Sequence, residues 1–148
     1  MENKNLKITS WVILLLSFVG FLDAAYLTIK KFFTSPLPCY IFQGCETVTT
    51  SPYSSIFGVP LSLLGAIFYL AIFIMIVRFF ETNSSKYFKS VFFLAVLGFL
   101  MDIYLVYIQG FVLKTFCFYC VVSAIVSTLI FLLVLLYKWK LRVETRKV

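Results

Sequence analysis

The sequence predicts an all-α membrane protein: a bundle of four transmembrane helices with a long outer loop between the first and second helices. The composition is the first observation behind this prediction. Of the 148 residues, 62% are hydrophobic and only 13% are charged, whereas soluble domains carry about 25% charged residues. So few charges cannot cover a surface that faces water, so lipid must be part of the solvent of this chain.

The second observation is the division of the apolar residues into four segments. Each has about 20 residues, the length that crosses a hydrocarbon core of about 30 Å as a helix. A helix is required because backbone polar groups in lipid find partners only within their own segment. The predicted spans cover about residues 11–29, 61–80, 91–112 and 117–137, and they form a single domain over residues 1–148.

The lysine and arginine residues orient this bundle. If both termini are cytoplasmic, ten of the 13 cations lie inside and three lie outside, which is the bias that cytoplasmic loops show. The inner cations are Lys4, Lys7, Arg78, Lys86, Lys89, Lys138, Lys140, Arg142, Arg146 and Lys147, and the outer ones are Lys30, Lys31 and Lys114. We therefore expect N-in, C-in topology in the cell (plasma) membrane. Because this placement explains the net charge of +7, we expect no nucleic-acid partner.

The predicted outer loop covers about residues 30–60, and long loops in compact proteins tend to be functional. It carries Cys39 and Cys45 on a segment that we expect to be flexible and exposed to water. Ser51-Pro52 is typical of a helix start, with serine at the N-cap and proline at the first helical position. This pattern predicts a short interfacial helix over residues 52–57.

The other two cysteines, Cys117 and Cys120, form a C-x-x-C motif at the start of the fourth predicted span. Side chains three residues apart share a helix face, and the positive end of the helix dipole stabilises a thiolate there. The thiolate is the species that drives thiol–disulfide exchange. The flanking Phe116, Phe118 and Tyr119 predict an aromatic pocket for a flat, lipid-soluble ring such as a quinone.

Three interpretations of the cysteines compete. All four fall on the outer side of the predicted topology, where disulfides form and persist. A zinc site would match the C-x-x-C half but not the spacing of Cys39 and Cys45, and the chain has no histidine. A purely structural disulfide within C-x-x-C would stabilise little, because the loop it closes is tiny. The pattern favours a relay that moves two electrons between the pairs and needs no metal.

Two other classes of function stay open at this point. The chain could be a binding or assembly protein whose disulfides only brace the loop, or a small transporter. Asp23 and Asp102 lie within predicted spans, where an ionised carboxylate is costly and a functional site is the default interpretation. Either residue could relay protons, line a transport path or join helices by hydrogen bonds.

The motifs in combination resemble the vitamin K epoxide reductase family. They are Cys45-Glu-Thr-Val-Thr-Thr-Ser51, Ser55-Ile-Phe-Gly-Val-Pro60 with Leu64-Gly65, and the distant Cys117-x-x-Cys120. The resemblance implies a four-helix bundle around a quinone (ubiquinone, menaquinone or similar), and an oxidoreductase that supports disulfide-bond formation outside the cytoplasm. The chain looks like a prokaryotic-type member without a fused thioredoxin-like domain. The resemblance therefore implies a separate thioredoxin-like thiol oxidase as partner.

The resemblance also implies a role for each residue of the site. Cys39 would meet the partner, Cys45 would pass electrons to Cys117, and Cys120 would lie nearest the quinone. Ser51 matches a serine that the family keeps six residues after the second loop cysteine. Its role would be catalytic or structural.

Overall fold

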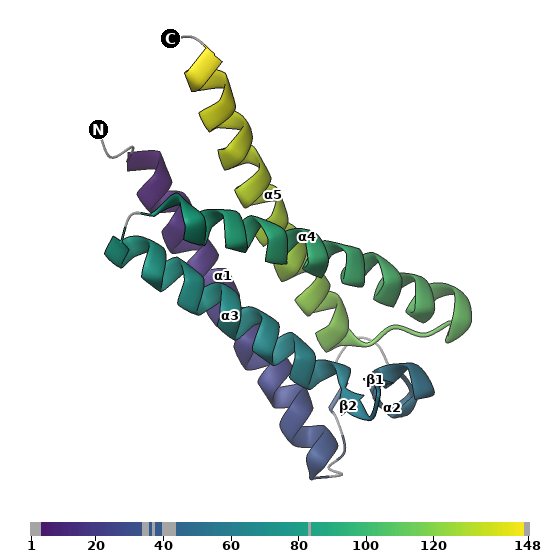
Figure 1. Ribbon diagram of the computed structural model, residues 1–148. Coiled ribbons are helices and arrows are strands. Elements are labelled where there is room, and N and C mark those ends of the chain that lie inside the picture. Colours follow the sequence, from purple (N-terminus) through teal and green to yellow (C-terminus); the bar gives the residue numbers. More distant parts are fainter. Residues whose placement is uncertain (1–3, 34–35, 37, 40–43, 83, 147–148) are drawn as a thin grey trace.

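The fold, seen in a computed structural model, is a bundle of four long helices with a small cap at one end (Figure 1). The described part of the chain comprises residues 4–33, 36, 38–39, 44–82 and 84–146. Outside it lie Lys147 of the cation pattern and, in the predicted outer loop, residues 34–35, 37 and 40–43.

The long helices are α1 (Lys4–Phe32), α3 (Leu61–Thr82), α4 (Ser85–Tyr107) and α5 (Phe118–Arg146). The stretches long and apolar enough to cross a membrane are Lys7–Phe32, Leu61–Thr82, Ser85–Val112 and Phe118–Lys140. These four stretches confirm the predicted class, an all-α bundle of four membrane-spanning helices. The first described turn of α1 and the last turn of α5 lie at one end of the bundle, and the cap lies at the other (Figure 1).

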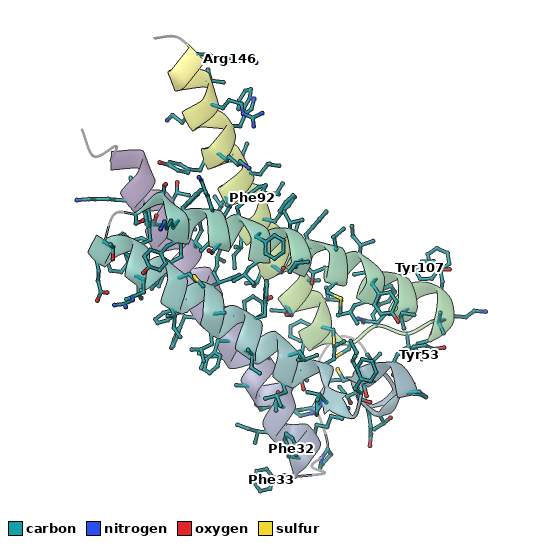
Figure 2. All side chains as sticks on the ribbon, viewed as in Figure 1. Phe32, Phe33, Tyr53, Phe92, Tyr107 and Arg146 are labelled. Atoms are coloured by element: carbon teal, nitrogen blue, oxygen red, sulfur yellow. A yellow bond between two sulfur atoms is a disulfide. The ribbon has the colours of Figure 1, made fainter. Side chains whose placement is uncertain are left out.

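Two kinds of side chain mark the lipid-facing surface. Large apolar residues such as Leu22, Ile67 and Leu100 are exposed on the outside of the bundle, where lipid is their natural surrounding. Exposed aromatic residues lie at the cap ends of α1 and of α4, at Phe32 and Tyr107 (Figure 2). Aromatic belts are typical of the membrane–water interface, so one interface lies near the cap.

The inside of the bundle is packed with aliphatic side chains. α1 packs against α3 and α5, and α4 packs against the same two helices. The fully buried aliphatic residues are Ile13, Ile72, Ile76, Val91, Ile130 and Val134. Five of the six lie in the half of their helix that is farther from the cap, and Ile130 lies just on the cap side of the middle of α5. This half of the bundle is therefore packed mainly by aliphatic side chains, with the buried hydroxyls of Ser10 and Ser17 on α1 among them.

α4 ends in a π-helical turn, Ile108–Val112, which lengthens the third span. The hydrogen bond typical of a π-helix, between residues i and i+5, runs from the N–H of Leu113 to the carbonyl of Ile108 at 2.9 Å. Lys114 then takes a positive φ of 52° and helps to reverse the chain toward α5. π-helical turns inside α-helices occur frequently at functional sites, and this one leads directly to the C-x-x-C motif.

The cap consists of short elements: α2 (Cys45–Thr50), the 3₁₀ turn η1 (Pro52–Ser54) and the strands β1 (Ser55–Ile56) and β2 (Val59–Pro60). The strands pair antiparallel, with Ser55 opposite Pro60. Phe57 and Gly58 at the tip have φ values of 50° and 81°, as a two-residue type I′ hairpin turn requires. The predicted helix over residues 52–57 is therefore wrong beyond Ser54, because the chain turns into a hairpin there.

Gly20 permits the close approach of α1 to α3. A Cβ atom at Gly20 would lie 2.5 Å from Cε1 of Tyr69. The Tyr69 ring cannot retreat easily, because it is 2% exposed and its hydroxyl donates a hydrogen bond to the carbonyl of Ser123 at 2.7 Å. The helix contact and the Tyr69 hydrogen bond therefore depend on each other.

We expect Gly20→Ala to lower the thermal unfolding midpoint in detergent, because overpacking a close contact costs about 1–3 kcal/mol. Gly65→Ala is the matched control. Its Cβ would lie 3.6 Å from that of Ala24, an ordinary contact, and alanine is the better helix former. Its midpoint should stay equal or rise. Equal midpoints for Gly20→Ala and the wild type would show that the α1–α3 contact is looser than described.

Candidate active site

The four cysteines lie together at the cap end of the bundle. Cys45 and Cys117 are both fully buried and form one packed cluster with Val48. Cys39 and Cys120 both pack against this cluster. Cys39 precedes the cluster residues in the sequence and Cys120 follows them. The structure therefore brings together two pairs of cysteines that are more than 70 residues apart in the chain.

The outer pair is oxidised and the inner pair is reduced. Cys39 and Cys45 form a disulfide with their Cα atoms 6.1 Å apart, and the backbone N–H of Cys45 donates to the Cys39 sulfur at 3.2 Å. Cys117 and Cys120 are thiols. One disulfide next to one dithiol is the arrangement from which thiol–disulfide exchange can proceed.

The expectation that Cys45 is exposed to water is wrong, whereas Cys39 is half-buried. The reason is the glycine before α2. A Cβ at Gly44 would overlap Oγ1 of Thr115 and would lie 2.8 Å from the carbonyl oxygen of Phe116. Only glycine allows α2 to lie this close to the segment before α5, so Cys45 packs beside Cys117 and leaves Cys39 as the more accessible sulfur.

Cys117 is the N-cap residue of α5, because its carbonyl accepts a hydrogen bond from the N–H of Val121 at 3.0 Å. Hydrogen bonds from the Cys120 thiol, and then from the backbone N–H groups of Cys120 and Tyr119, favour the thiolate and hold the pKa of Cys117 below its usual value. Burial and the charge of Asp23 act in the opposite direction without outweighing these bonds. The predicted thiolate site at this helix start is therefore supported by named donors.

Gln109 is a site residue that the sequence reasoning missed. It is 3% exposed, and its Oε1 accepts a hydrogen bond from the backbone N–H of Cys117 at 3.0 Å. Its own carbonyl accepts the N–H of Thr115, also at 3.0 Å. A buried donor left without a partner costs about 1–3 kcal/mol, so Gln109 holds the segment that carries Cys117. A lone glutamine in an apolar span was the signal that could have found it.

Tyr119 ties the loop that carries Cys39 to the start of α5. Its hydroxyl donates to the carbonyl of Pro38 at 3.1 Å, one residue from Cys39. Its ring centroid lies 5.3 Å from that of Tyr26 on α1. Tyr119 therefore connects three parts of the chain around the cysteine cluster.

A cavity of about 340 Å³ lies beneath the cap, between α1, α3, α4 and α5. Pockets for small molecules have about 300–1,000 Å³, so a flat ring of modest size fits. Among the described residues, Cys120 is the one cysteine in the wall of the cavity. Much of the wall is apolar, with Leu27, Phe68 and Met101 from three helices. Cys120 thus borders both the cysteine cluster and the cavity.

The aromatic residues expected to bind a ring lie elsewhere. Phe118 and Tyr119 pack against the cysteine cluster, Phe116 is 37% exposed, and none of the three is among the described residues of the cavity wall. Neighbours in a helix point in different directions, and Phe116 lies before α5 begins, so proximity to Cys120 in the sequence does not bring the three residues to its cavity. Their part in binding a ring stays a prediction.

The mouth of the cavity is formed by the cap. Ser51 lies in the wall, but its hydroxyl does not cap η1; it donates back to the carbonyl of Val48 at 2.8 Å. Lys31 connects α1 to the cap, because its Nζ donates to Oγ of Ser54 at 2.7 Å. Whether Ser51 is catalytic or structural stays a prediction. Among the described residues no cluster of His, Cys, Asp and Glu could hold a metal ion.

A bundle of four membrane helices that joins a disulfide, a dithiol and an apolar cavity defines a membrane protein of thiol–disulfide redox chemistry. A sequence model of the vitamin K epoxide reductase family matches residues 11–135, most of the chain, and the chain belongs to this family. A search of curated proteins found no match. Membership confirms the resemblance and makes the chain a multi-pass membrane protein of a quinone-linked oxidoreductase family.

We expect Gly44→Ala to slow the formation of a Cys45–Cys117 disulfide, because the added Cβ pushes α2 away from Thr115. The measurement uses a Cys39→Ser, Cys120→Ser background and follows cross-linking by a mild oxidant on non-reducing gels. Thr47→Ala, on the exposed side of α2, should cross-link at the rate of the background. Unchanged cross-linking in Gly44→Ala would mean that the cap does not depend on this contact.

We expect the thiolate of Cys117 to form at a pH below the usual cysteine pKa of about 8.5. Its fraction rises as the pH passes the lowered pKa, and ultraviolet thiolate absorbance of a reduced Cys39→Ser, Cys45→Ser variant reports it. Adding Cys120→Ala should move the midpoint to higher pH, because the largest stabilising hydrogen bond is lost. A midpoint that does not move would assign the lowered pKa to the helix start alone.

Proposed function

We propose that the chain, as one domain over residues 1–148, is a protein-dithiol:quinone oxidoreductase of the membrane. It oxidises a separate thioredoxin-like thiol oxidase and passes two electrons to a quinone. The observation that carries this proposal is the contact of Cys45 with the Cys117 cluster while Cys120 lies in the wall of an apolar cavity. Sulfur atoms then connect the accessible Cys39 to the cavity.

Electrons enter through two exchanges at the outer pair. A thiolate of the partner attacks Cys39, which breaks the Cys39–Cys45 disulfide and releases the Cys45 thiolate. The second thiol of the partner then displaces Cys39, so the partner leaves as a disulfide. Each exchange breaks one S–S bond and forms another through a mixed disulfide.

Electrons reach the inner pair by the same chemistry. The Cys45 thiolate attacks Cys117 of the Cys117–Cys120 disulfide and releases Cys120. Cys39 then attacks Cys45, which restores the outer disulfide and leaves Cys117 and Cys120 reduced. This final state corresponds to the cysteine states of the described structure. The lowered pKa of Cys117 favours the reduced inner pair, so electrons are drawn inward.

The quinone is the second substrate of this reaction. Oxidation of the Cys117–Cys120 dithiol supplies the two electrons that convert it to a quinol. The size of the cavity and its apolar wall support a quinone ring next to Cys120, with ubiquinone, menaquinone or a similar compound as the candidate. The cation pattern supports a cap outside the cytoplasm of the cell membrane, where it would serve disulfide-bond formation.

We expect Cys120→Ala to abolish quinol formation, because the inner pair can no longer form a disulfide. Cys117 can still attack Cys45, so a Cys45–Cys117 linkage should accumulate. The measurement adds a reduced thioredoxin-like dithiol protein and a soluble quinone to purified protein in detergent and follows quinone absorbance. Ile125→Ala, on the lipid-facing side of the same helix, should turn over normally.

Turnover of Cys120→Ala at the wild-type rate would refute this scheme. A folded wild type that reduces none of several quinones with several dithiols would favour a structural or transport role instead.

A further inference from the structure

Three polar side chains form a layer in the wall of the cavity, below Cys120. They are Asp23 from α1, Asp102 from α4 and Ser127 from α5, and we call them the polar floor. In the described part of the chain, Oδ2 of each aspartate and Oγ of Ser127 are buried and have no hydrogen-bond partner. Ser127 is 2% exposed, and it lies close to the Asp102 carboxyl without making a hydrogen bond of good geometry.

The unpaired oxygens of the polar floor contrast with neighbouring polar groups. The Tyr69 hydroxyl, in the same cavity wall, is bonded to Ser123, and the buried hydroxyls of Ser17 and Thr28 donate to carbonyls of their own helix. A buried oxygen without a partner is costly, and the one other such side-chain atom among the described residues, Oγ of Ser10, lies outside the cavity wall. Three such oxygens from three helices around one cavity indicate that a ligand in the cavity supplies the partners.

The three residues of the polar floor lie at a similar depth in the bundle, below Cys120. Ser127 is seven residues after Cys120, which is two helical turns along the same face and about 10 Å along α5 at 1.5 Å per residue. Asp23 and Asp102 lie nine and ten residues from the cap ends of their spans, a similar depth. A ring in the cavity therefore has the sulfur of Cys120 above it and the polar floor below it.

We propose that the polar floor is the proton-donating end of the quinone site, with Asp23 and Asp102 as the donors and Ser127 as a hydrogen-bond partner. This inference rests on the proposed function. Reduction of a quinone to a quinol takes two electrons and two protons, and an O–H bond of each carboxyl breaks as an O–H bond of the quinol forms. Oxidation of the Cys117–Cys120 dithiol releases two protons, which restore the two carboxyl groups. The balance is complete without another reactant.

The first test separates proton donation from electron entry. Asp102→Asn keeps the shape and a hydrogen-bonding amide but cannot donate an acidic proton, and general acids contribute about 100-fold or more to rate. We expect quinol formation to fall by about 100-fold in Asp102→Asn, and to fall also in Asp23→Asn. Maleimide labelling during turnover should show Cys117 and Cys120 accumulating as thiols, because electrons still enter through the outer pair.

Two further variants define the role. Asp102→Glu keeps the carboxyl group and should recover part of the activity that Asp102→Asn loses. No such recovery is expected if replacing Asp102 prevents folding. Glu81→Gln changes an exposed carboxylate paired with Arg78 near the inner end of α3 and should behave as the wild type. If the maleimide labelling of both cysteine pairs changes more slowly in Asp102→Asn than in the wild type, Asp102 has a structural role and the proposal is overturned.

The second test needs no turnover. Infrared difference spectra, recorded when a soluble quinone is added to oxidised protein, should show a shifted carboxylic-acid C=O band that disappears in Asp102→Asn. The proposal is overturned if the wild type shows no such band or if the asparagine variants form quinol at the wild-type rate. A wild type that shows the band but forms no quinol would instead refute the proposed function and leave the polar floor as a ligand site.

Discussion

The redox site depends on how closely the cap packs against the segment that leads into α5. Exchange between two cysteine pairs requires that their sulfur atoms meet, and here the approach of Cys45 to Cys117 is set by backbone rather than by long side chains. Gly44 rests against Thr115 and Phe116 with no room for a Cβ. Gln109 fixes the same segment from the other side through the N–H of Cys117. The position of Cys45 beside Cys117 follows from these two contacts.

One turn of α5 divides the chemistry into two environments. Cys117, as N-cap, lies among backbone N–H donors in the buried cluster that it shares with the cap. Cys120, three residues later, lies in the wall of the cavity between the helices. A single helix start therefore connects protein thiols to a compartment suited to a lipid-soluble acceptor.

Much of the architecture could be predicted from the sequence, because lipid constrains the chain in a simple way. The length of each apolar segment indicated the four helices, and the C-x-x-C motif indicated a helix start at Cys117. The cavity wall could not be predicted, since helices that are apolar all round give little signal of which face points inward. The unforeseen position of Asp102 beside Ser127 is a consequence of this ambiguity.

The cap was harder to predict for a different reason. The burial of Cys45 depends on Thr115, a residue 70 positions away, and no local pattern reports such a contact. The hairpin places Phe57 at a positive φ, a conformation that bulky residues rarely adopt. Gly58 alone gave only a general turn signal, so the stretch after Ser51-Pro52 suggested a helix.

The apolar half of the bundle has a consequence for the energetics of the membrane. Between the polar floor and the ends of the helices away from the cap, Ile72, Ile76, Ile130 and Val134 are fully buried, and this largely aliphatic packing opposes the passage of ions and water. On the proposed function, electrons and protons both enter from the cap side. Turnover therefore carries no charge across the bilayer, and it neither draws on the membrane potential nor adds to it. Any energy stored from this electron flow is stored later, by the enzyme that reoxidises the quinol.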